Sequence, residues 1–114
     1  MKVVRIAVGF IGILLTLSSY GTNILIHNDA PPVSITVCYG KGPCTKLNVV
    51  PTNGISQPIK VEQDIAITVS APRLKSVTFG IAELNRNRGG LEYHIVAKKG
   101  RLVFEIHAPA NFFD

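Results

Sequence analysis

The sequence predicts an all-β protein: a small immunoglobulin-like β-sandwich of about seven or eight short antiparallel strands, with a small β-barrel as the alternative. Two observations lead to this fold class. After residue 21, apolar and polar residues alternate with a period of two, and no stretch repeats apolar residues at helical spacing. Turn-forming Gly, Pro, Asn and Ser separate these stretches at intervals of roughly ten residues. Short strands at such spacing are typical of sandwiches and barrels.

Residues 1–21 are predicted to form a signal helix that is removed on export. Lys2 and Arg5 give a positive start, and residues 6–17 form an apolar run. As a helix, this run spans about 18 Å, well short of the roughly 30 Å of bilayer hydrocarbon. Ser19 and Gly21 have the spacing that signal peptidase reads. We expect one domain of residues 22–114 in the periplasm or outside the cell, with an uncleaved membrane anchor as the alternative.

The expected strands cover the residue ranges 24–27, 33–39, 44–50, 59–61, 65–69, 77–81, 91–97 and 102–106. Asn28 to Pro32 ends the first strand, and Pro51 to Gly54 is a predicted turn. The ranges 59–61 and 65–69 have the same parity and are interpreted as separate strands or one bent strand. Ala71-Pro72-Arg73 is a predicted break.

Cys38 and Cys44 are predicted to close the first hairpin with a disulfide. They are the two cysteines of the chain, and an exported protein favours their oxidation. Pairing them places Val37 opposite Thr45, and continuing the same register places Ile35 opposite Leu47. The last pair in this register is Val33 with Val49. The apolar pattern and the cysteines therefore predict one register.

The last hairpin is predicted to turn at Lys99-Gly100, with Lys98 opposite Arg101. This register puts Ala97, Ile95 and Tyr93 opposite Leu102, Phe104 and Ile106, which makes one face apolar. On the other face, His94 is opposite Glu105 and Glu92 is opposite His107.

This second face is the His/Glu face, formed by Glu92, His94, Glu105 and His107. Its simplest interpretation is a set of cross-strand salt bridges on an exposed sheet. The second interpretation is a metal site, because two imidazoles and two carboxylates are suitable zinc ligands. The third is acid–base cleavage of a phosphodiester with Arg101 nearby.

Two loops are candidate binding surfaces. Tyr39 and Lys41 belong to the loop that the cysteines tether, and tethering lowers the entropy lost on binding. Arg86 and Arg88 lie in a polar Asn- and Gly-rich loop and are suited to carboxylates or phosphates.

The sequence favours a non-enzymatic binding or accessory module over an enzyme. It has no G-x-S-x-G, H-E-x-x-H or P-loop motif, and we assign no catalytic residue, no metal ligand and no cofactor. Without Lys2 and Arg5, ten basic residues face seven acidic ones, a net charge of +3. A nucleic-acid partner is therefore not expected, and a protein partner is. A small secreted hydrolase or a metal-binding protein is the alternative.

Overall fold

A computed structural model describes residues 23–84 and 91–108 of the chain. The predicted signal helix, residues 1–21, lies outside the described residues. Within the described ranges, no helix is long and apolar enough to cross a membrane.

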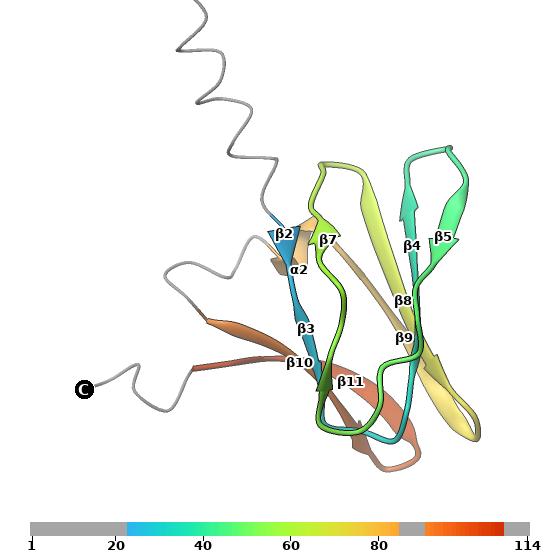
Figure 1. Cartoon of the computed structure of the whole chain (residues 1–114), viewed down its shortest axis with the longest axis vertical. Helices are drawn as coiled ribbons and strands as arrows, with labels where there is room; N and C mark the ends of the chain where they lie inside the picture. Colours follow the sequence, from blue (N-terminus) through green and yellow to red (C-terminus); the bar gives the residue numbers. More distant parts are fainter. Residues whose placement is uncertain (1–22, 85–90, 109–114) are drawn as a thin grey trace, which may run out of the picture.

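The described residues confirm the all-β class (Figure 1). The strands are β2 (Asn23–Ile24), β3 (Ile26–Asn28), β4 (Ser34–Tyr39), β5 (Cys44–Lys46), β6 (Gly54–Ile55), β7 (Ile59–Lys60), β8 (Ile65–Ala71), β9 (Leu74–Gly80), β10 (Glu92–Lys98) and β11 (Arg101–His107). A one-turn helix, α2 (Ile81–Leu84), follows β9.

Eight of these strands form one curled sheet, in the order β5-β4-β8-β9-β11-β10-β3-β6, while β2 and β7 form a small sheet of their own. Figure 1 shows β4, β8 and β9 side by side, with the β10–β11 hairpin crossing below them. The sheet turns at β9 and β11, which are joined by the single pairing of Lys75 with Arg101. The described residues thus form a half-barrel, and an immunoglobulin-like sandwich is not confirmed.

The expectation of purely antiparallel strands is wrong for two pairings. β3 pairs with β10 in parallel, and β9 pairs with β11 in parallel. In both cases the two strands are separated by intervening chain that lets the second strand run in the same direction as the first. These pairings join the N-terminal strand and the C-terminal hairpin into one surface.

The concave side of the curled sheet holds the core. Ile26, Ile35, Ile67 and Ile95 are completely buried there. Phe79 of β9 stacks on Phe104 of β11, with ring centroids 4.0 Å apart. Apolar residues from every long strand therefore meet on one side, which leaves the alternate residues of β10 and β11 facing outward.

The register of the β10–β11 hairpin is confirmed over its whole length, from Lys98 opposite Arg101 to Glu92 opposite His107. Its two-residue turn has positive φ at both Lys99 (52°) and Gly100 (80°). Positive φ at both positions is the backbone form that suits the twist of a hairpin.

The predicted register of the cysteine hairpin is confirmed near the disulfide and is wrong at the far end of the hairpin. Cys38 and Cys44 are bonded, and Val37 is opposite Thr45. Val33, however, pairs with Val50 rather than Val49. One extra residue bulges out between Leu47 and Val50, which leaves Val49 exposed and Val50 buried.

The predicted turn over residues 51–54 is present: the Gly54 N–H donates to the Pro51 carbonyl at 2.9 Å, and Gly54 also begins β6. Of the two interpretations of the ranges 59–61 and 65–69, that of separate strands is correct, and the strands lie in different sheets. Residues 81–84 form α2 rather than a strand end. The Glu83 carboxylate accepts a hydrogen bond from the Gly80 N–H at 2.8 Å, which caps the first turn of the helix.

Candidate metal centre

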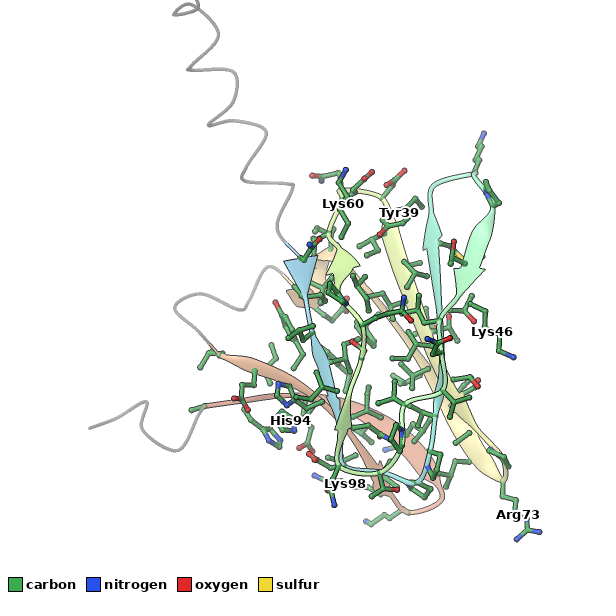
Figure 2. The ribbon with its side chains drawn as sticks, viewed as in Figure 1. Tyr39, Lys46, Lys60, Arg73, His94 and Lys98 are labelled. Carbon is green, nitrogen blue, oxygen red and sulfur yellow. A yellow bond between two sulfur atoms is a disulfide. The ribbon has the colours of Figure 1, made fainter. Side chains whose placement is uncertain are left out.

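The outward face of β3, β10 and β11 gathers all three histidines of the sequence. The parallel register places His27 beside His94, and the hairpin register places His94 beside Glu105. The neighbours Ile26 and Ile95 are buried, so these histidines belong to the opposite side of the sheet. Figure 2 shows His94 on this outer side, away from β4 and β8.

The three imidazole rings form a stack, which we call the histidine stack: His27, His94 and His107. The centroids of His27 and His94 are 4.7 Å apart, and those of His94 and His107 are 4.1 Å apart. The planes differ by 13° and 18°. His94 is therefore enclosed between two other imidazoles, and 13% of its side chain is exposed.

His94 also contacts one carboxylate at each of its ring nitrogens. Nδ1 lies 2.5 Å from Oδ2 of Asp29, and Nε2 lies 3.0 Å from Oε1 of Glu92. Burial lowers the pKa of His94, but the hydrogen bonds to Glu92 and Asp29 outweigh burial and raise the pKa above its ordinary value. The hydrogen bond from His94 in turn lowers the pKa of Glu92.

Asp29 is held beside His94 by a buried turn. The Asn28 side-chain amide donates to the backbone oxygens of Pro31, Val50 and Pro51, and its oxygen accepts the Ala30 N–H. The Asp29 N–H then donates to the Ile95 carbonyl at 2.8 Å, extending the pairing of β3 with β10. Asn28 is 1% exposed and fully engaged, so the position of the neighbouring Asp29 is fixed by the core.

His107 and Glu105 form the outer end of this face. Nε2 of His107 lies 2.8 Å from Oε1 of Glu105, whose other oxygen accepts from Lys98 at 2.5 Å. These contacts, first with His107 and then with Lys98, lower the pKa of Glu105. The cross-strand positions are as predicted, but each His–Glu hydrogen bond joins residues two apart on one strand, His94 to Glu92 and His107 to Glu105.

Two overlapping groups of side chains each bring three possible metal ligands close together. The first is His27, Glu92 and His94, and the second is Asp29, His94 and His107. Within each group, the candidate ligand atoms lie within 4.8 Å of one another. Ligands of a tetrahedral zinc ion lie about 3.4 Å apart, given Zn–N bonds of about 2.0–2.1 Å. A metal ion lies in the plane of each imidazole that it binds, so binding at either group requires the neighbouring ring to rotate out of the parallel stack.

Reasoning from the sequence missed His27 and Asp29. His27 has the outward parity of the first expected strand, and that signal was available. The pairing of β3 with β10 was not, because the two strands are far apart in the chain and only the fold brings them together.

The other predicted site residues lie away from this centre. The Tyr39 hydroxyl donates to the Lys60 carbonyl, and the two residues lie together at one end of the molecule (Figure 2). Burial raises the pKa of Tyr39, and the charges of Glu62 and Asp64 raise it further. Lys41 is exposed at the tip of the tethered loop. Arg86 and Arg88 lie outside the described residues.

Comparisons with protein-family models, with curated proteins and with solved structures find no match to this chain.

Proposed function

We propose that this chain is an exported metal-binding protein that takes a divalent transition ion, with zinc and copper as the ions its ligands suit. The observation that carries the proposal is the histidine stack, in which three imidazoles share a face with Asp29 and Glu92. Imidazole nitrogen suits zinc and copper, whereas magnesium and calcium take oxygen ligands.

The contacts favour a metal site over ordinary surface salt bridges. A surface ion pair needs one cation and one anion, but here His94 contacts two carboxylates while it stacks on two further imidazoles. A metal ion that displaces the ring protons of His94 would use the same nitrogen and carboxylate atoms as its ligands.

The same contacts give less support to phosphodiester cleavage. That reaction needs a cation beside the acid and the base, but Lys98 is paired with Glu105, and the Val96–Val103 pair separates Arg101 from His94. Arg101 lies opposite Lys98 at the turn end of the hairpin. The His/Glu face therefore offers more ligands for a cation than for a phosphate.

Export rests on the sequence of residues 1–21 and is supported by the disulfide. A Cys38–Cys44 bond is compatible with an extracellular or periplasmic location. The binding or accessory role expected from the sequence stays a prediction, and metal binding gives it a chemical basis.

The test is direct metal binding by the full chain, purified with its disulfide intact and without a polyhistidine tag. After removal of metal with a chelator, the protein is titrated with zinc sulfate or copper sulfate and followed by calorimetry. Elemental analysis after dialysis then gives the number of ions retained. We expect at least one ion per chain.

His94→Gln is expected to weaken binding at least about 100-fold, since loss of an outer-sphere partner alone costs about 10–100-fold. Glu62→Gln is the matched control. It removes a carboxylate that pairs with Lys60, at the other end of the molecule (Figure 2). No retained zinc or copper, or equal loss in both variants, would contradict the proposal.

A further inference from the structure

We infer that His94 bridges two metal ions, one bound at each of its ring nitrogens. The first ion is bound by Asp29, His107 and Nδ1 of His94. The second is bound by His27, Glu92 and Nε2 of His94. This inference rests on the proposed metal-binding function and specifies the number of ions and the ligand that joins them.

The two hydrogen bonds of His94 mark the two positions. To donate to Asp29 and to Glu92 at once, the ring must carry a proton on each nitrogen. Each proton lies between a ring nitrogen and a carboxylate oxygen. Replacing each proton by a metal ion keeps both atoms as ligands, with the side chains rotating to widen the gap and to turn the neighbouring imidazole out of the parallel stack.

Each of the other two histidines, His27 and His107, belongs to one of the two proposed ion positions. His27 groups with Glu92 and His94, whereas His107 groups with Asp29 and His94. The two groups have only His94 in common. A single ion cannot bind both nitrogens of one imidazole, because their lone pairs point away from each other, so complete use of both groups requires two ions.

Charge supports the same arrangement. Two divalent ions bring four positive charges, and the deprotonated His94 ring with Asp29 and Glu92 brings three negative ones. When both ions bind, both ring protons of His94 pass to the buffer, one for each nitrogen that becomes a ligand. No oxidant, reductant or other reactant is needed.

The competing arrangement is a single ion with an outer-sphere carboxylate. Metal-bound histidines commonly donate their second N–H to a carboxylate, which orients the ring. In that case one of the two groups holds the ion, and the carboxylate of the other group serves only as the hydrogen-bond acceptor. The two arrangements differ in stoichiometry and in the effect of each substitution.

The experiment counts copper(II) and zinc ions in the full chain and in five variants. The wild type is expected to retain two ions. H27Q and E92Q are expected to retain the Asp29–His107 ion alone, and H107Q and D29N the His27–Glu92 ion alone. H94Q is expected to lose the bridge and to bind both ions far more weakly. Circular dichroism on each variant checks the fold.

Electron paramagnetic resonance of the copper-loaded protein provides a second measurement. Two copper(II) ions on one imidazolate are magnetically coupled, so the wild-type signal is expected to be weaker than twice the signal of H27Q. One ion per chain, or two uncoupled ions, overturns the bridge but leaves the proposed function in place. No bound ion overturns both.

Discussion

At the scale of single residues, two opposing effects act on the pKa of His94. Its side chain is mostly covered by the neighbouring imidazoles, which disfavours the charged ring. Asp29 and Glu92 favour the charged ring through hydrogen bonds, and they prevail, so the pKa of His94 is raised. Without metal, His94 therefore stabilises the fold in its protonated form.

The stability of the metal-free protein is expected to reflect this shift. A raised pKa contributes stability that is complete below about 6.5, the value in the unfolded chain, and lost as pH rises through the folded value. Urea unfolding with chelator present should show a larger difference between wild type and H94Q at about pH 6 than at about pH 9. A difference that is equal at both pH values, or larger at pH 9, would contradict the assignment.

The β10–β11 turn gives a second prediction for a single residue. Lys99 has a φ of 52°, a left-handed conformation that costs most residues about 1–2 kcal/mol. Lys99→Asn is expected to raise the free energy of unfolding by about 0.5–1 kcal/mol, because Asn adopts this conformation more readily. Thermal or urea unfolding measures the gain. Lys99→Val, which is β-branched, should instead lower stability.

At the scale of elements, the β4–β5 hairpin depends on its disulfide. β5 has only three residues, all exposed, and it lies at the edge of the sheet. The Cys38–Cys44 bond ties this edge to β4, which pairs along its full length with β8. The bond closes a short loop, so its contribution is moderate.

Replacing both cysteines by serine is expected to lower the free energy of unfolding by about 2 kcal/mol, from the loop-closure estimate for so short a segment. Denaturant unfolding measures the change. A reducing agent should destabilise the wild type by a similar amount and leave the double variant unaffected. Metal binding should be retained in the double variant wherever it is folded, because the histidine stack lies on other strands. Loss of metal from the folded variant would contradict this separation.

At the scale of the whole molecule, the fold depends on the contact between the two halves of the curled sheet, β5-β4-β8-β9 and β11-β10-β3-β6. Between β9 and β11, the backbone pairing is limited to Lys75 with Arg101. Packing between side chains therefore holds these two strands together. Phe79, Phe104 and Tyr93 form a stacked row across this junction, with centroids 4.0 and 5.6 Å apart. The candidate metal centre lies on the outer side of the same strands, so these rings also support it.

Phe79→Ala is expected to lower the free energy of unfolding by about 3–5 kcal/mol, the usual cost of removing a buried aromatic ring. Phe79→Leu should cost clearly less because it keeps much of the buried volume. Denaturant unfolding of the two variants provides the comparison. An equally small loss of unfolding free energy in both variants would show that other contacts hold the two halves of the sheet together.

The all-β class, the disulfide and the two hairpin registers next to their turns are predictable from the sequence alone. Each of these depends on contacts between nearby residues, where alternation and turn chemistry are sufficient. It did not predict the extra residue that moves Val33 opposite Val50, because a bulge leaves the apolar pattern unchanged on either side.

The curled sheet and the candidate metal centre depend on contacts between distant parts of the chain. The sequence showed two histidines and two glutamates on one hairpin face. The parallel pairing of β3 with β10 adds His27 and Asp29 to them, and the His94–Asp29 contact joins residues 65 positions apart. Such pairing depends on how the whole core closes, because no local pattern selects which distant strand completes the edge of a hairpin.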